Sequence, residues 1–524
     1  MKFKCCLTFC YFIFLILCTG TALSASVAPE EEWNWTYEGY EGGYHELAYA
    51  VQETRDGGYI LAGESWVEYG DESARLTKFD SKGKVEWSKD FFNGSTHLYT
   101  ENCLQQTIDG GYVLAGNIVT HDELDWYNSS SYPWLAKADS NGKEEWERTF
   151  GDGEGGNAEA IQKTDDGGYI IIGHIDLGDK YIPNYLIKTD SRGIEEWNKT
   201  LGYSSDSIYN IQKTEDGGFI LAGARSYQDE TGSSDTKFLL IKTDSDINEE
   251  WNKTFERIDI APYYHRYIAL SSTADGGCIL AGTAVDANGN ENAVLMKIDS
   301  DGNQEWKRTF GGGNKIQVLS VKSTSDGGYV LGGEIICDGV LSERGYFEPS
   351  AALLIKTDSN GNEEWNMTIE SPTDNDENTQ ERVTSVQETS DKGYILAGET
   401  YYFDRSRTDA WLIKLSGEKN ETDGKENETY ENKTCEEKNE GTEVHELQRC
   451  INSLKITDNN TSSLNNRVEE ISCHIVNGEE EKAVCKLEKL IELINEMSRR
   501  CELNSNQATI LIEKAQKAIE SIES

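Results

Sequence analysis

Positively charged side chains are scarce in this sequence relative to negatively charged ones. Its 524 residues include 49 Lys and Arg against 94 Asp and Glu, which gives a formal net charge of −45. Because a phosphate backbone binds to basic surfaces, this charge excludes nucleic acid as a partner. Proline is also scarce, with 6 residues, whereas glycine (49), tyrosine (26) and tryptophan (12) are plentiful. Disordered chains have few aromatic residues, so the composition predicts a folded, all-β protein with many tight turns.

Long apolar runs are almost absent. One apolar run, residues 7–17, follows Lys2 and Lys4 and precedes a stretch of small residues. It is shorter than the ~20 residues that a membrane-spanning helix needs. We therefore interpret residues 1–25 as a secretory signal peptide, with an uncleaved N-terminal anchor as the alternative. The mature chain is expected to be secreted or at the cell surface, with no transmembrane span.

Sequons and cysteines agree with export. Asn-X-Ser/Thr sequons crowd a polar linker, and there we predict glycosylation of Asn420, Asn427 and Asn432. Four of the twelve cysteines lie in the predicted signal peptide. An oxidising exterior permits disulfide bonds among the others, although their spacing specifies no pairing and matches no zinc site.

Two motifs recur along most of the chain. The first is Asp-Gly-Gly followed by an aromatic residue and Ile/Val-Leu-Ala-Gly, and the second is Asp-Ser-X-Gly followed by a Trp. Repeats that are 50 to 65 residues long are typical of propellers and solenoids. The Asp of the first motif stands at Asp56, Asp109, Asp166, Asp216, Asp275, Asp326 and Asp391.

Each repeat predicts four strands, with one motif forming the turn after the first strand and the other the turn after the third. Four antiparallel strands form one blade of a β-propeller. The seventh repeat lacks its fourth strand, and Glu31–Thr36 closely matches Glu249–Thr254. We therefore predict an all-β seven-bladed β-propeller over residues 26–416, in which the N-terminal strand closes the last blade.

The sequence changes in character after the propeller. Residues 417–440 form a polar, glycosylatable linker. In residues 441–524 the apolar positions recur at helical spacing, as two long stripes and two shorter helices at 444–454 and 464–475. This pattern predicts a small all-α helical bundle.

These motifs carry two resemblances. The repeats resemble those of secreted and cell-surface β-propeller proteins of archaea and bacteria, and the run from Asp358 to Trp365 is similar to the docking motif of quinoprotein propellers. Quinoprotein dehydrogenases need a bound quinone and often an adjacent cysteine pair; the mature chain has no such pair, so that cofactor does not carry over. Residues 464–522 resemble the FIMAH-type helical domain, with an Asn477-Gly478 turn between helices. That resemblance implies an appended module of secreted proteins, often beside carbohydrate-related or adhesive domains.

The order of strands predicts two different faces of the disc. The repeated turns lie on one face, and loops of variable length lie on the other, where binding residues concentrate on a rigid scaffold. Alternatively, the aromatic residues of those loops only pack the loops onto the disc. The ligand-binding candidates are Trp126, Tyr127, Trp134, Tyr263, Tyr264, His265, Tyr401 and Tyr402.

The other patterns have structural interpretations. We interpret the recurrent Trp as packing between neighbouring blades rather than as a sugar-stacking platform. The acidic run at 358–364 lacks the sixth-position glycine of an EF-hand loop, so it predicts a turn, with weak calcium binding around 299–305 or 286–291 as an alternative. No cofactor or metal site is predicted. No motif of a serine hydrolase, phosphate loop or zinc protease is present, so the catalytic residues of an enzyme remain unknown.

We expect a non-catalytic recognition or adhesion protein of the cell envelope, acting as a monomer. Its partner would be a glycan or a surface protein, bound through the variable-loop face. One alternative is a polysaccharide-acting hydrolase or lyase with its site in the central pocket. A second alternative is a structural component of the envelope.

Overall fold

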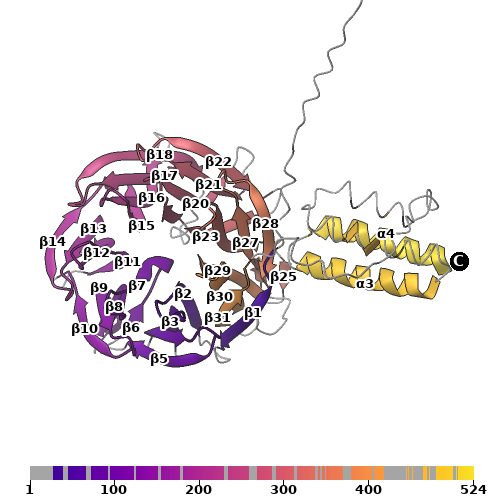
Figure 1. Ribbon diagram of the computed structural model, residues 1–524, viewed down its shortest axis with the longest axis horizontal. Coiled ribbons are helices and arrows are strands. Elements are labelled where there is room, and N and C mark those ends of the chain that lie inside the picture. The colour runs from indigo at the N-terminus through magenta and orange to yellow at the C-terminus, as the bar shows by residue number, and fades with distance from the viewer. Residues whose placement is uncertain are drawn as a thin grey trace, which may run out of the picture.

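A computed structural model gives the architecture of the chain, and Figure 1 shows its strands arranged around a central axis as in a β-propeller. The structure describes residues 28–38, 45–66, 72–91, 95–122, 125–151, 155–176, 181–228, 234–258, 268–285, 291–311, 315–336, 340–342, 345–347, 350–369, 379–403, 406–417, 480–499 and 505–523, with isolated positions between 444 and 471 and at 503.

Four of the repeats form separate, four-stranded antiparallel sheets. In each sheet the strand that precedes the Asp-Gly-Gly turn lies at one edge and the Trp-bearing strand at the other. Their strands are β2 (Glu46–Glu53), β3 (Tyr59–Trp66), β4 (Glu72–Phe79) and β5 (Val85–Phe91); β11 (Gly155–Lys163), β12 (Tyr169–Asp176), β13 (Tyr181–Thr189) and β14 (Glu195–Thr200); β15 (Asp206–Lys213), β16 (Phe219–Gln228), β17 (Ser234–Thr243) and β18 (Glu249–Ile258); β19 (Ile268–Ser272), β20 (Cys278–Val285), β21 (Glu291–Ile298) and β22 (Gln304–Phe310).

The second repeat forms a five-stranded sheet because its first strand is interrupted. Two short strands, β6 (Ser95–His97) and β7 (Leu104–Gln106), both pair with β8 (Tyr112–Asp122), which continues through β9 (Asp125–Ala138) to β10 (Glu144–Thr149).

The 3₁₀ turn η1 (Glu101–Cys103) connects β6 to β7 and contacts two distant repeats. Lys322 Nζ of the sixth repeat donates to Glu101 Oε1 at 3.0 Å, and Gln212 Nε2 of the fourth repeat donates to Asn102 Oδ1 at 3.2 Å. The turn therefore ties together three repeats around the axis.

The last two repeats share one eight-stranded sheet with the N-terminal strand. Strand β29 is ten residues long and extends far enough for Gln380 to form a parallel bridge with Ser350 of β27. A small hairpin, β25–β26, lies outside this sheet. The strands are β23 (Lys315–Ser323), β24 (Tyr329–Ile336), β25 (Val340–Ser342), β26 (Gly345–Phe347), β27 (Ser350–Thr357), β28 (Glu363–Ile369), β29 (Thr379–Glu388), β30 (Tyr394–Tyr402), β31 (Arg407–Leu415) and β1 (Glu31–Tyr37).

The prediction of seven separate blades is therefore wrong. Five sheets of the described chain stand as individual blades, four with four strands and one with five. The strands that the sequence assigned to two further blades are joined into the eight-stranded sheet. The reason is the bridge from Ser350 to Gln380, which is reinforced by the Ser350 hydroxyl, because Oγ donates to the Glu381 carbonyl at 3.2 Å.

The predicted pairing of the two ends of the repeat region is confirmed. Strand β1 runs antiparallel to β31, with Trp33 opposite Lys414 and Trp35 opposite Leu412. The backbone N–H of Ser416 donates to the Glu30 carbonyl at 2.8 Å, which extends the pairing by one bond. The N-terminal strand thus covers the edge of β31, and that edge is not left open for another chain.

The C-terminal region also differs from its prediction. Its described part has two helices, α3 (Glu480–Arg499) and α4 (Ser505–Glu523), which pack on each other through residues such as Leu490 and Leu511. Within the described residues the structure therefore shows two continuous helices and not the predicted helical bundle. The shorter predicted helices at 444–454 and 464–475 fall mostly outside the described residues. Within the described chain, neither helix is long and apolar enough to cross a bilayer.

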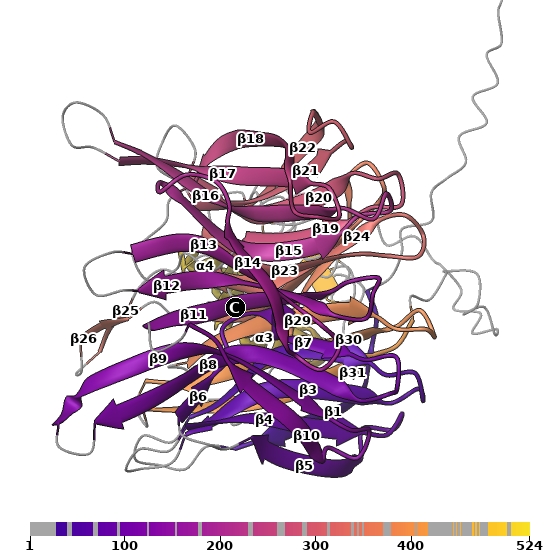
Figure 2. The same ribbon diagram turned by 90° about the vertical axis from the view of Figure 1, so that its left-hand side faces the viewer.

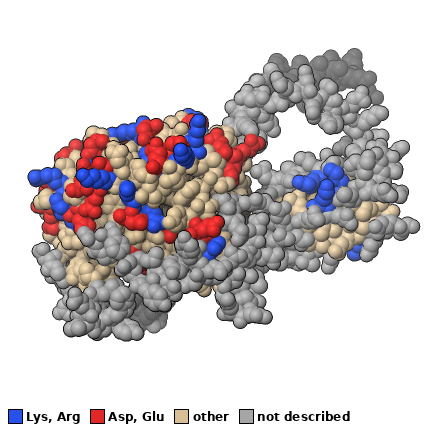
Figure 3. Space-filling view, turned by 90° about the horizontal axis from the view of Figure 1, so that it is seen from below, with Lys and Arg blue, Asp and Glu red and all other residues tan. Residues whose placement is uncertain are grey.

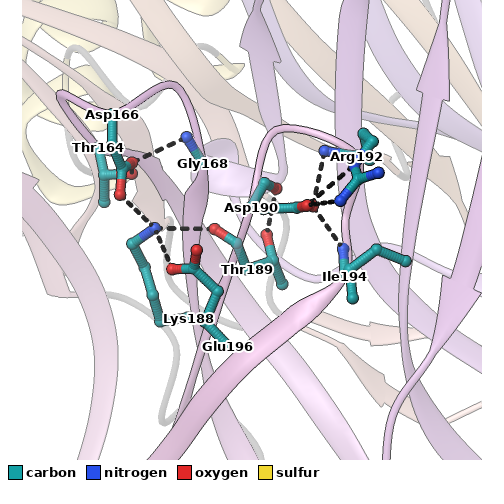
Figure 4. Close-up of polar contacts among 9 residues, drawn as sticks. All are labelled: Thr164, Asp166, Gly168, Lys188, Thr189, Asp190, Arg192, Ile194 and Glu196. Atoms are coloured by element: carbon teal, nitrogen blue, oxygen red, sulfur yellow. Dashed lines mark hydrogen bonds and ion pairs between the residues drawn. The ribbon is translucent and has the colours of Figure 1, made fainter.

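A buried lysine explains the first repeated motif (Figure 4). Lys188 of β13 donates to Asp166 Oδ2 at 2.8 Å, to Glu196 Oε2 at 3.1 Å and to the Thr189 carbonyl at 2.8 Å. The other Asp166 oxygen accepts from Thr164 Oγ1 and from the Gly168 backbone N–H. The same arrangement recurs at Lys78, Lys137, Lys242, Lys297, Lys356 and Lys414.

The recurrent Trp packs between neighbouring repeats, as predicted. A Cβ added at Gly361 would lie 2.5 Å from Cζ3 of Trp306, a residue of the preceding repeat, and Gly193 stands in the same relation to Trp146. Glycine is required at 361 for a second reason as well, because its φ of +74° is one that other residues rarely adopt. These Trp side chains are therefore structural.

The two predicted faces are visible in the side view. Figure 2 shows the β8–β9 hairpin and the β25–β26 hairpin projecting from the same side of the disc. The short repeated turns lie at the opposite ends of the strands. Charged side chains of both signs are interspersed over the described surface in Figure 3.

Candidate functional site

The aspartates of the Asp-Ser-X-Gly turns are already hydrogen-bonded within their turns. Asp358 Oδ1 accepts from the backbone N–H groups of Asn360 and Asn362, both at 2.8 Å, and Oδ2 accepts from the Asn362 side chain at 2.9 Å. Burial raises the pKa of Asp358, but these hydrogen bonds outweigh it, so the pKa lies below its usual value. The run at 358–364 is thus a turn whose carboxylate is already used.

No group of three or more His, Cys, Asp or Glu that is able to hold a metal ion occurs among the described residues. Asp299, in the other calcium candidate at 299–305, makes the same turn contacts as Asp358, with Asp301 and Asn303. Most of the candidate at 286–291 lies outside the described residues.

The variable-loop face carries a row of half-buried rings that crosses three neighbouring repeats. His45 stacks on Tyr401 (centroids 6.3 Å apart, 19° between planes) and meets Trp66 edge-on at 5.3 Å. Trp66 in turn meets His97 edge-on at 6.4 Å. We call the whole set the aromatic row: Phe403, Tyr401, His45, Trp66, His97 and Tyr99.

Strand ends place these rings together. Trp66 is the last residue of β3, which ends at the variable-loop face, and His97 belongs to β6, which begins at that face and pairs with β8. His45 immediately precedes β2; its backbone forms a bridge to Thr408, and its Nδ1 lies 2.8 Å from Thr408 Oγ1. That contact depends on the position of the last repeat beside the first. Burial lowers the pKa of His45, an effect that the charge of Glu399 partly opposes.

Carboxyl groups lie beneath and beside the aromatic row. Glu64 is fully buried and accepts from Trp66 Nε1 at 3.3 Å and from the Leu98 backbone N–H. Burial raises the pKa of Glu64 to about 8; these hydrogen bonds oppose the shift, and the charges of Glu72 and Glu399 add to it. Because Glu64 is buried, with 3% of its surface exposed, it supports the row and does not contact a ligand.

Glu72 is the accessible carboxyl of the site. Its Oε2 lies 2.5 Å from His97 Nε2, and the two side chains are 23% and 19% exposed. Burial raises the pKa of Glu72 above its usual value. Glu72 and His97 thus form a polar pair whose atoms are open to a ligand lying along the rings.

A second polar group comes from the last repeat. Arg382 Nε donates to Glu399 Oε1 at 2.6 Å, and the arginine side chain remains 32% exposed. Burial raises the pKa of neighbouring Glu334, and Arg382 and the Ser350 hydroxyl partly offset this. The site thus combines ring faces with an exposed guanidinium and an exposed carboxyl–imidazole pair. Such a surface suits a ligand that has both apolar ring faces and hydroxyl groups.

The structure separates the residues that the sequence nominated. Tyr401 belongs to the aromatic row. Trp134 and Tyr402 are buried in the core, at 1% and 0% exposure, so they present no surface to a ligand. Trp126 and Tyr127 belong to β9, but their side chains are outside the described residues.

Several other nominated residues also lie outside the described residues. They are Tyr263, Tyr264, His265, Asn420, Asn427 and Asn432. Among the described cysteines, Cys103 and Cys278 are buried and form no disulfide bond.

Sequence reasoning missed His45, Trp66 and His97 because they are far apart in the chain. A signal was nevertheless present. Gly63-Glu-Ser-Trp66 and Gly398-Glu-Thr-Tyr401 place the same Gly-Glu-Ser/Thr-aromatic pattern at the same strand end in the first and last repeats. Once β1 pairs with β31, these two repeats are neighbours.

Comparison with known proteins yields structural neighbours without a family. No family model and no curated protein matches the chain. The propeller domain of the Trilobed protease from Pyrococcus furiosus is similar over 72% of this chain and 97% of its own, at 12% identity and a TM-score of 0.40. An α-L-arabinanase from Penicillium chrysogenum, complexed with arabinobiose, covers 73% and 98%, at 10% identity and a TM-score of 0.38.

A third similar structure is the subtype N10 neuraminidase-like protein of A/little yellow-shouldered bat/Guatemala/060/2010. It covers 59% of this chain and 96% of its own, at 9% identity and a TM-score of 0.34.

Proposed function

We propose that this protein binds carbohydrate through the aromatic row, as a recognition protein rather than an enzyme. The observation that carries the proposal is the continuity of the six rings across three repeats. A row of this kind offers several adjacent platforms, so it fits a chain of sugar rings better than a single compact ligand. Glu72, His97 and Arg382 would donate and accept hydrogen bonds at the hydroxyl groups.

Stacking on rigid aromatic side chains costs little conformational entropy. The half-burial of the rings, together with contacts such as Trp66 Nε1 to Glu64, holds them in place before a ligand arrives. A saccharide would therefore bind without rearrangement of the strands.

A hydrolase or lyase is the second candidate, and the Glu72–His97 pair favours it. Burial raises the pKa of Glu72, as an acid catalyst requires. The pair lies on the face of the disc, whereas η1 occupies part of the central axis where the sequence placed a catalytic site.

A panel of soluble polysaccharides separates the two candidates. Each is incubated with residues 26–524, then assayed for retardation of the protein in a native gel and for release of reducing or unsaturated ends. Retardation without release supports recognition, and release that is lost in Glu72→Gln supports the enzyme. If no polysaccharide retards the protein and none releases reducing or unsaturated ends, both candidate functions are rejected.

Export, glycosylation of the linker and the role of the C-terminal helices belong to the same proposal. A carbohydrate-binding propeller at the cell envelope accounts for the predicted signal peptide and for the sequons at Asn420, Asn427 and Asn432. The mass of the protein secreted by its host, before and after enzymatic deglycosylation, tests this part.

A further inference from the structure

A pocket of about 500 Å³ lies on the turn face, on the opposite side of the disc from the aromatic row. It opens between the Asp-Gly-Gly turns of the second and third repeats and is bounded by Lys213 of the fourth. This volume is in the range of small-molecule sites and is far larger than an inorganic ion needs. Ile108, which is 80% exposed, forms an apolar part of the lining.

The charged groups of the pocket do not cancel. Lys137 is paired with Asp109 at 2.8 Å and also with Glu145, and Lys213 is paired with Asp165. Lys163 donates to the neutral carbonyl of Gln106 at 2.6 Å, and it has no ion pair with a carboxylate in the described part of the chain. Of the three lysines in the lining, Lys163 is thus the one whose charge is not offset by a carboxylate of the described residues.

Arg55 adds positive charge at the rim, where its Nη1 donates to the Ile108 carbonyl at 2.7 Å. Burial, and then the charge of Arg55, lowers the pKa of Lys163. An anion beside Lys163 would relieve both effects, because it would offset the lost hydration and screen the arginine.

The equivalent positions of other repeats are occupied differently. In the first repeat the position of Lys163 is occupied by Glu53. The Glu53 carboxylate accepts two hydrogen bonds from Ser390 of the preceding repeat, one from its backbone N–H at 2.8 Å and one from its Oγ at 2.6 Å. Glu388 binds Ser325 in the same way. At those boundaries an acidic side chain joins the two repeats, whereas at Lys163 a cation lines an open pocket. The net charge of −45 makes a local excess of positive charge unusual here.

We propose that this pocket is a second binding site, which takes a small organic carboxylate of about the size of an acidic monosaccharide. The carboxylate would lie against Lys163 and Lys213, and the apolar part of the ligand against Ile108. Thr107, Thr164 and Ser191 supply hydroxyl groups around it.

Calorimetric titration of residues 26–524 with sodium D-galacturonate, and in parallel with uncharged D-galactose, tests the site. We expect saturable galacturonate binding that is at least tenfold tighter than galactose binding. Lys163→Gln should weaken it about tenfold or more, and Lys163→Arg should preserve most of it. The control Lys199→Gln, which removes a half-buried lysine outside the pocket lining, should leave it unchanged. Circular dichroism confirms that each variant is folded.

The row variant Trp66→Ala makes this site distinguishable from the proposed carbohydrate site. Galacturonate binding that survives Trp66→Ala and is lost in Lys163→Gln supports the pocket. Equal affinity for galacturonate and galactose, or galacturonate affinity that is unchanged in folded Lys163→Gln, would overturn the proposal. Binding that is lost in Trp66→Ala alone would assign the acidic sugar to the aromatic row and also overturn it.

Discussion

Lys356 forms an ion pair with Asp326, in which Nζ lies 2.7 Å from Oδ2 and the lysine side chain has no exposed surface. The same ammonium group donates to Glu364 Oε2 at 2.6 Å and to the Thr357 carbonyl at 3.0 Å. All three donor positions of the lysine are thus used, which compensates for the loss of hydration. The pair shows that the most repeated residues of this protein serve its stability, and that its binding residues must be sought among those that do not repeat.

Removal of this lysine should destabilise the fold. Lys356→Met leaves Asp326 and Glu364 without their partner, but these carboxylates are 52% and 30% exposed, so water compensates in part. We expect a loss of about 2 kcal/mol in the free energy of unfolding, less than for a fully buried pair. Urea unfolding followed by circular dichroism measures it. The exposed Lys82→Met should change the free energy by less than about 0.5 kcal/mol, and an equal effect of both variants would contradict the structural role.

The contact between repeats can be tested at one glycine. Gly361→Ala should destabilise the protein by roughly 1–3 kcal/mol more than Gly327→Ala. Both glycines have positive φ, +74° and +88°, so both variants carry the same backbone strain. A Cβ at Gly361 would meet Trp306 at 2.5 Å, whereas the nearest side-chain atom to one at Gly327 is 3.9 Å away. If urea unfolding shows the same loss of unfolding free energy for both variants, the Trp306 side chain can move away from the added Cβ without destabilising the protein.

Glu64 predicts a specific dependence of stability on pH. Its pKa is about 8 in the folded protein against 4.5 for an unperturbed glutamate, because burial disfavours the charged form. The folded state therefore holds a proton that the unfolded state releases above about pH 4.5. This contribution to stability is complete below that pH and is lost as the pH rises through 8.

Glu64→Gln should flatten the decline of the unfolding free energy between about pH 5 and 8. Part of the decline should remain, because burial also raises the pKa of Glu46 to about 7. Urea titrations at several pH values give the slope. The exposed Glu215→Gln is the control, and a slope that Glu64→Gln leaves unchanged would show that Glu64 is not protonated in the folded state.

The sequence predicts the units of this fold better than their association. The Asp-Gly-Gly and Asp-Ser-X-Gly turns, the four strands per repeat and the pairing of β1 with β31 follow from local patterns and from the match of Glu31–Thr36 to Glu249–Thr254. The bridge between Ser350 and Gln380 does not, because it depends on where a long strand reaches after a variable loop. The blade count therefore failed at the point where a tertiary contact merges two units.

The same distinction applies to the site. Tyr401 was found because aromatic residues cluster around it, and Tyr402 was chosen with it for the same reason. A strand places consecutive side chains on opposite faces, so Tyr402 points into the core, where the Arg407 guanidinium lies 4.8 Å from its ring centroid. His45, Trp66 and His97 are far apart in the sequence, and the stacking of His45 on Tyr401 depends on the closure of the ring.

The most direct test of the central claim is the affinity of row variants for a polysaccharide that retards the wild-type protein. Trp66→Ala and Tyr401→Ala are compared with Tyr227→Ala, which removes a 42%-exposed tyrosine from another repeat on the same face. The account predicts at least a tenfold loss of affinity for each row variant, as for a central aromatic anchor, and no loss for Tyr227→Ala. Folded row variants that bind as tightly as the wild type would contradict it.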